Sequence, residues 1–199
     1  YELDEAYTNI NKTMDITSDD FDDMVDNATK IANANGVTTN SVLDMMKVYA
    51  NAGTTIEQIN AKMEMATAFQ NVTGQNAEQV TNSIQAIMNQ FKLAQDTAYE
   101  AADSMEYLGD VMVGVGYNLA KDESLAMQDI IAGVENAGAV VKNSGGSFEW
   151  LAAVVGTLSE QMNATGEETA NAMKMISART LQSKEAIDEL VAAGEDMSE

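Results

Sequence analysis

The absence of proline from this 199-residue chain constrains its fold more than any other single feature. Proline removes a backbone donor and clashes with the preceding turn, so a chain without it is free to form helix anywhere. Apolar residues recur at intervals of three and four, which places them on one face of a helix. The clearest stripes are Ile56, Ile59, Met63 and Ala66; Ala77, Val80, Ile84, Ile87 and Phe91; Met127, Ile130, Val134, Ala137 and Val141; and Phe148, Leu151, Val155, Leu158 and Met162.

Capping residues and glycines mark where these helices start and stop. Capping boxes are predicted at Thr54 with Glu57, Asn76 with Gln79, Thr97 with Glu100 and Thr165 with Glu168. Helix ends are predicted at Gly36, Gly53, Gly74, Gly145, Gly166 and Gly194, because glycine accepts the left-handed closing conformation. We therefore expect helices near 3–14, 19–34, 41–51, 56–72, 76–92, 98–113, 123–142, 148–163, 167–181 and 184–193. The run 109–118, with Gly109, Gly114 and Gly116, either kinks a helix or opens a loop.

These interruptions are too frequent for a continuous coiled coil. Short connections between amphipathic helices favour antiparallel neighbours. The expected fold is all-α, a compact multi-helix bundle of about nine or ten helices forming one domain over residues 1–199. The chain starts at Tyr1 without an initiator Met, which suggests an excerpt from a longer polypeptide.

Composition narrows the functional classes. There is no Cys and no His, so a thiol nucleophile, a zinc thiolate site and the commonest general base near neutral pH are all excluded. Asp and Glu number 32 against 10 for Lys and Arg, a formal net charge of -22. Such a charge repels nucleic-acid phosphates and anionic membrane surfaces, so we expect no direct nucleic-acid binding and no membrane binding by this segment.

The densest polar feature is the acidic run at 17–26, whose carboxylates could in principle bind calcium. They are Asp19, Asp20, Asp22, Asp23 and Asp26. The run lacks the glycine and the distal glutamate of a calcium loop. Phe21, Met24, Val25 and Ala28 instead make it one side of an amphipathic helix. We interpret the carboxylates as a solvated helix face.

Two carboxylate pairs and two glycine clusters are the remaining candidates for chemistry. Glu167 with Glu168, and Asp122 with Glu123, fall in first turns of expected helices, where capping and the helix dipole explain them. The glycine clusters of 111–118 and 142–147 have neither the Gly-Lys-Ser/Thr order of a phosphate-binding loop nor a strand before the turn, and Ser147 reads as an N-cap. We therefore assign no catalytic, cofactor-binding or metal residues, and expect no enzymatic activity and no cofactor.

The chain is rich in Met, with 14 residues, several of them on the apolar stripes. They include Met45, Met46, Met63, Met65, Met88, Met105, Met112, Met127, Met162, Met173 and Met175. Because Met fills irregular gaps, core packing is the default interpretation, and an adaptable partner-binding surface is the alternative. Trp150, one turn into its helix, is expected to anchor the core.

Residues 40–181 resemble the core region of phage tail tape-measure proteins. The resemblance is carried by VYANAGTTIEQINAKMEMATAFQNVTGQNAEQV (48–80), IMNQFKLAQDTAYEAADSM (87–105) and ENAGAVVKNSGGSFEWLAAVVGTLSEQMNATGEETANAMKMISART (135–180). Lys92 stands where the family often has glycine. Residues 1–39 and 182–199 add flanking helices.

The resemblance implies a structural virion protein that lies inside the tail tube, sets tail length, scaffolds tube assembly and leaves ahead of the DNA. The implied partners are other copies of the chain, tail-tube and tail-tip or initiator proteins, and assembly chaperones. The implied locations are the tail-tube interior and, during assembly, the host cytoplasm. From the residues alone, a helical adaptor of bacterial signalling or secretion and a cell-wall lytic domain remain as alternatives.

Overall fold

The computed structural model describes residues 2–119 and 123–196, and over these residues the chain is helical, without strands. The helices are α1 (Glu2–Met14), α2 (Ser18–Asn35), α3 (Thr39–Asn51), α4 (Ile56–Thr73), α5 (Ala77–Phe91), α6 (Ala98–Leu119), α7 (Glu123–Asn143), α8 (Phe148–Met162) and α9 (Gly166–Asp196). The all-α, multi-helix prediction is therefore confirmed.

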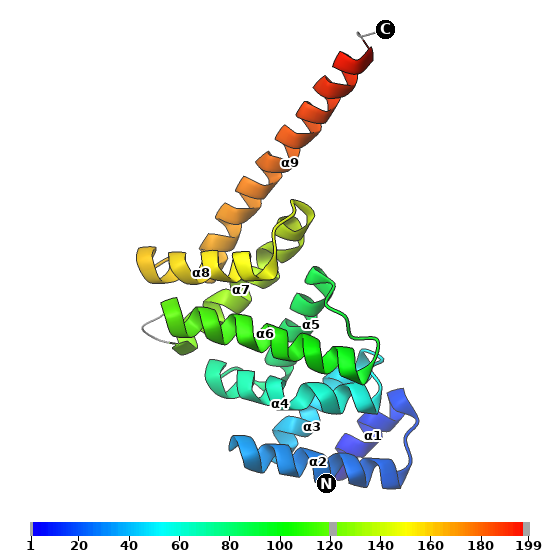
Figure 1. The fold of residues 1–199 in the computed structure, drawn as a ribbon. Helices are drawn as coiled ribbons and strands as arrows, with labels where there is room; N and C mark the ends of the chain where they lie inside the picture. Colours follow the sequence, from blue (N-terminus) through cyan, green and yellow to red (C-terminus); the bar gives the residue numbers. More distant parts are fainter. Residues whose placement is uncertain (1, 120–122, 197–199) are drawn as a thin grey trace.

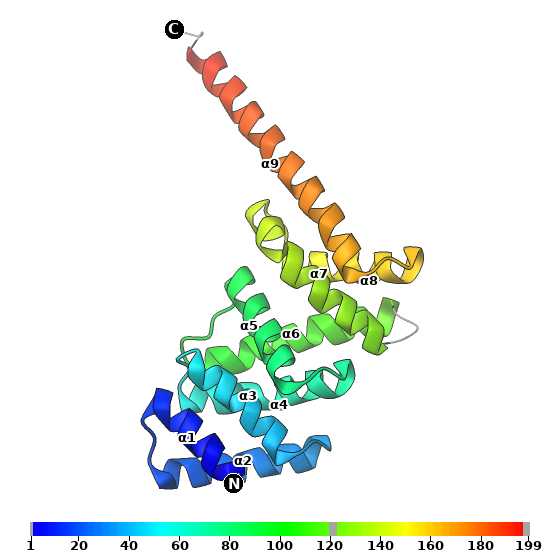
Figure 2. The same ribbon diagram turned by 180° about the vertical axis from the view of Figure 1, so that it is seen from behind.

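The helices are stacked so that each one packs against the helix two places further along the chain. Contacts join α1 to α3, α2 to α4, α3 to α5, α4 to α6, α5 to α7, α6 to α8 and α7 to α9. Odd-numbered and even-numbered helices thus form two adjoining rows. In Figures 1 and 2, α1 and α2 lie at one end of this stack, α7 and α8 lie toward the other, and α9 projects away from it.

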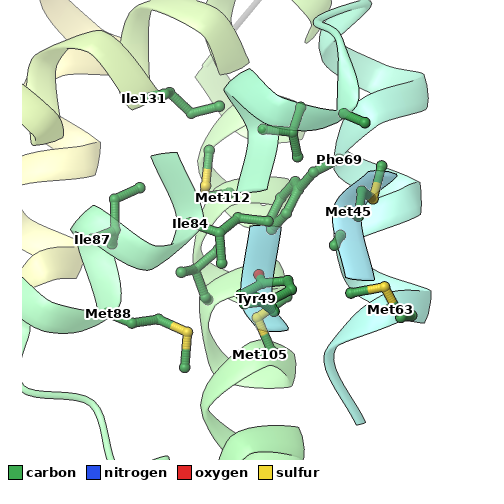
Figure 3. Packing of buried hydrophobic residues seen from close by; sticks show 14 of the residues in the cluster. Met45, Tyr49, Met63, Phe69, Ile84, Ile87, Met88, Met105, Met112 and Ile131 are labelled. Carbon is green, nitrogen blue, oxygen red and sulfur yellow. The ribbon is translucent and has the colours of Figure 1, made fainter. Parts of the chain in front are cut away.

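One apolar core follows the whole stack, from Ile10 in α1 to Met173 in α9. Every residue of the stripes that begin at Ala77 and Met127 is buried. Figure 3 shows how side chains of four successive helices meet in the middle of this core, with Tyr49 of α3, Met63 of α4, Ile84 of α5 and Met105 of α6 close together. Each such side chain contributes about 1.5–3 kcal/mol on burial.

The capping predictions are mostly confirmed. Reciprocal bonds form at Asn76 with Gln79, at Thr97 with Glu100 and at Thr165 with Glu168. The pair Thr54 and Glu57 is wrong by one residue. Thr55 and Gln58 form the box, because the N–H of Thr54 still donates to the Tyr49 carbonyl that closes α3.

Glycines end helices at Gly36 and Gly74, both in the left-handed conformation. Two of the predicted helix ends are wrong. Gly166 begins α9, and Gly194 lies inside it, while Asn163 takes the left-handed position that closes α8. The break expected between 181 and 184 is also absent, because no proline or glycine interrupts the backbone there and α9 runs through it.

The run 109–118 is continuous helix within α6, so its glycines do not open a loop. Gly109 of α6 lies against the side chain of Met65 in α4. A Cβ at Gly109 would lie 2.6 Å from both Sδ and Cε of Met65, so the flexible end of that methionine would have to move to make room for it.

Trp150 does not anchor the core. Its side chain is 47% exposed, whereas the neighbouring Leu151 is fully buried. The same helix turns Met162 to solvent at its end, so the stripe that begins at Phe148 is buried only in its first half. Most Met residues named above are buried, as expected for core packing, but Met162 and Met175 are exposed.

Candidate functional site

The acidic run of α2 forms a solvated helix face. Asp19, Asp20, Asp22, Asp23 and Asp26 are all exposed, whereas the apolar residues between them face the core. Asp20 accepts hydrogen bonds from the backbone N–H and the hydroxyl of Thr17, and these bonds lower the pKa of the carboxyl. This capping box at Thr17 was missed in the sequence. Over the described residues, no group of three acidic side chains is placed to hold a metal ion.

Of the two carboxylate pairs, only Glu167 and Glu168 have described side chains, and these two do not face each other across a cleft. Glu167 and Glu168 lie exposed in the first turn of α9, where Glu168 caps the helix through Thr165. Asp122 lies outside the described residues, and Glu123 is the first residue of α7. The glycines of 142–147 close α7, and Ser147 caps α8 through the N–H of Trp150, as predicted.

The most distinctive element is the projecting part of α9. The buried residues Ala170 and Met173 lie in its first half, next to α7 and α8. Beyond Leu181, every side chain through Glu189 is exposed. Ile176, Ile187 and Val191 are among the large apolar side chains that this helix leaves in solvent. Over the described residues, no helix has the length and apolar character needed to span a membrane.

The second distinctive feature is Lys62 of α4, which is 1% exposed at a polar cleft. The cleft has a volume of about 730 Å³ and lies between the end of α3, the start of α4, α5 and the segment before α6. Its side chains are mostly carboxamides and hydroxyls. They belong to Thr54, Thr55, Gln58, Asn82, Gln85, Asn89 and Gln95, with Asp96 as the acidic member.

Lys62 has no carboxylate partner among the described residues. Its Nζ donates to Gln95 Oε1 at 2.8 Å and lies 4.9 Å from the centroid of the buried Tyr49 ring. Burial lowers the pKa of Lys62 to about 8. Gln58 holds the adjoining segment by donating to the backbone oxygens of Gln95 and Asp96.

Sequence reasoning missed Lys62. The available signal was its position, because Lys62 directly precedes Met63 of a predicted apolar stripe and lies between Ile59 and Ala66. A lysine at the margin of a stripe usually extends its charged end into water, so this position alone did not predict burial.

The comparisons with known proteins agree with a structural role. Residues 25–198 match the family described as phage-related minor tail protein. No curated protein and no solved structure matches the chain. The match covers most of the chain, including the acidic face of α2 in part, the Lys62 cleft and α9. The chain therefore belongs to the phage-related minor tail protein family, which makes it a component of a phage tail.

Proposed function

We propose that this chain is a segment of a tail tape-measure protein, which sets tail length and scaffolds the tube from the inside. Two observations support the proposal. The chain belongs to a phage tail family over residues 25–198, and residues 40–181 carry the three stretches that resemble the tape-measure core. In such a role, the contribution of each part of the fold to tail length depends on whether that part is folded or extended.

The main support for the proposal is the arrangement of the chain, in which the stacked helices α1–α8 are followed by the projecting helix α9 (Figure 1). A helix advances about 1.5 Å per residue, so the 31 residues of α9 span about 46 Å. Helices that fold back on one another contribute far less length per residue. In this proposal α1–α8 form a folded head, and α9 begins the extended part that measures length.

The proposed partners follow from that location. Other copies of the chain and tail-tip or initiator proteins would contact α9 and the head, tube proteins would surround them, and chaperones would hold the segment before assembly. The formal charge of -22 is compatible with a tube through which DNA must pass, because it does not attract phosphates.

Two in-frame changes in the parent gene test this assignment. An insertion of 36 helix-forming residues after Gln182 adds ten turns to α9 and should lengthen tails by about 54 Å in electron micrographs. A glycine- and serine-rich insertion of equal length is the matched control, and it should not lengthen tails by that increment.

The second change duplicates residues 40–181. Because this segment is folded, tails should grow by far less than the roughly 210 Å that the same residues would span as one extended helix, or assembly should fail. Viable tails longer by the full increment would mean that the head opens inside the tube. An unchanged tail length after the helical insertion would overturn the measuring role.

A further inference from the structure

We propose that the cleft between α3, α4 and α5 binds a carboxylate, with Lys62 as its charged partner. The proposal does not depend on the tape-measure role. It starts from a buried cation that has a solvent cleft beside it and no carboxylate partner among the described residues.

The hydrogen bonds of Lys62 are incomplete. An ammonium has three N–H donors, and the described residues supply one hydrogen-bond acceptor, Gln95 Oε1 at 2.8 Å. The Tyr49 ring faces the ammonium from the apolar side. A buried charge is costly unless it is paired, and in a chain with 32 acidic residues none of the described ones pairs with Lys62.

The cleft supplies the rest of a site for a small anion. Asn82, Gln85 and Asn89 line it at helical spacing along α5. No hydrogen bond to another described residue occupies the carboxamides of Asn82 and Gln85. Each carboxamide offers two N–H donors. A bound carboxylate would replace the Gln95 oxygen at Nζ, because a bond between two charged groups is stronger than one to a neutral carboxamide.

The charge of the site favours a carboxylate over a more highly charged anion. Lys62 is the cationic side chain among the residues that line the cleft, and Asp96 lies exposed among them. One positive charge matches a monoanion, whereas a phosphate dianion would leave negative charge uncompensated in a protein of formal charge -22. The carboxylate could belong to a small free acid or to an acidic side chain of a second copy.

The test follows Lys62 itself by NMR, using protein labelled with ¹³C at lysine Cε. Acetate is titrated against sodium chloride of equal ionic strength. A bound carboxylate favours the charged amine, so the Lys62 titration midpoint should rise by at least half a pH unit and saturate. The exposed Lys92 serves as the internal control and should not respond.

A dilution series separates the two sources of carboxylate. If a second copy supplies it, the Lys62 midpoint rises with protein concentration in the absence of added acid, and sedimentation shows a dimer. If a free acid supplies it, the midpoint follows acetate at every protein concentration. A Lys62 midpoint that responds to neither series overturns the proposal.

Two variants show whether the binding belongs to this site. Lys62→Met removes the charge and keeps a side chain of similar length, and it should abolish the thermal stabilisation that acetate gives the wild type. Gln85→Ala leaves Lys62 and its Gln95 partner in place and should weaken acetate binding several-fold. Equal stabilisation of the wild type and both variants would show that acetate acts elsewhere on the protein, which would also overturn the proposal.

Discussion

Trp150 and Leu151 are neighbours in α8 with opposite environments. Trp150 is 47% exposed and Leu151 is 0% exposed. Leu151→Ala should therefore lower the free energy of unfolding by about 2–5 kcal/mol, because it leaves a cavity in the core. Trp150→Ala should cost less than about 1 kcal/mol, as surface substitutions do. Urea unfolding measures both, and a larger loss at Trp150 than at Leu151 would contradict the placement of this helix.

Gly166 and Gly114 are both helical glycines, but only one of them is confined. A Cβ at Gly166 would collide with the backbone carbonyl of Asp129 in α7, whereas a Cβ at Gly114 meets no atom within 4 Å. Gly166→Ala should separate α9 from α7 and cost about 1–3 kcal/mol, since the Gly166 N–H also donates to Asp129 Oδ1.

Gly114→Ala is the matched control. Alanine is the better helix former, so this variant should be neutral or more stable by up to about 1 kcal/mol. Thermal unfolding compares the two variants. The close contact of α9 with α7 would be disproved if Gly166→Ala were tolerated as well as Gly114→Ala.

Lys62 makes stability depend on pH in a defined direction. Burial lowers its pKa to about 8 from the ordinary 10.5, so between these values the unfolded chain binds more protons than the folded one. The contribution of Lys62 to stability therefore rises with pH across that window. Any stability advantage of Lys62→Met over the wild type should shrink from pH 7 to pH 9.5, by on the order of 1 kcal/mol after allowance for solvent screening.

Chemical unfolding of both proteins at several pH values measures this difference. Because the other titrating groups are common to the two proteins, their contributions largely cancel. A stability difference that stays constant between pH 7 and pH 9.5 would show that Lys62 is solvated in the folded state.

At the scale of single elements, α9 has two halves with different roles. Its first half is held by α7 and α8, while the exposed side chains 182–189 make no part of the core. A chain that ends after Leu181 should keep the thermal midpoint of the full chain and lose only helical signal. A chain that ends after Thr165 should be markedly less stable, because it removes Ala170 and Met173 from the core.

Circular dichroism melts of the two shortened chains provide the measurement. A large drop in midpoint after removal of residues 182–199 alone would mean that the projecting half folds back onto the body or joins two copies in solution. Sedimentation of the full chain distinguishes these two cases.

The whole molecule is a stack in which each helix is supported chiefly by close neighbours along the chain. A fold of this kind gains stability from nearest-neighbour interfaces, so its ends open more easily than its middle. Amide hydrogen exchange should therefore be slowest in α4, α5 and α7, which have partners on both sides, and faster in α1, which packs on α3. Equal protection in α1 and α5 would indicate a single cooperative unit instead.

Local structure was predictable from the sequence because it depends on residues close together in the chain. The spacing of Val80, Ile84 and Ile87 predicts a buried helix face, and all three are buried. Capping at Asn76 and at Thr97 was predictable for the same reason, since the bonded groups are three residues apart. The left-handed conformation of Lys92, where the resembling family often has glycine, shows that this helix end is kept even without the favoured residue.

Only the tertiary structure determined which side chains are buried and where a glycine is required, because both depend on the helix packed alongside. Trp150, one turn into its helix, was expected to anchor the core, but it lies off the stripe that begins at Phe148 and is 47% exposed. Gly166 was predicted to end a helix, but it begins α9. Glycine fits at this position because the backbone of Asp129 in α7 leaves no room for a Cβ. Lys62 is buried because α3, α5 and the Gln95 segment close around it. Periodicity specifies which face of a helix is apolar, whereas burial requires a second surface, and only the folded chain determines where that surface lies.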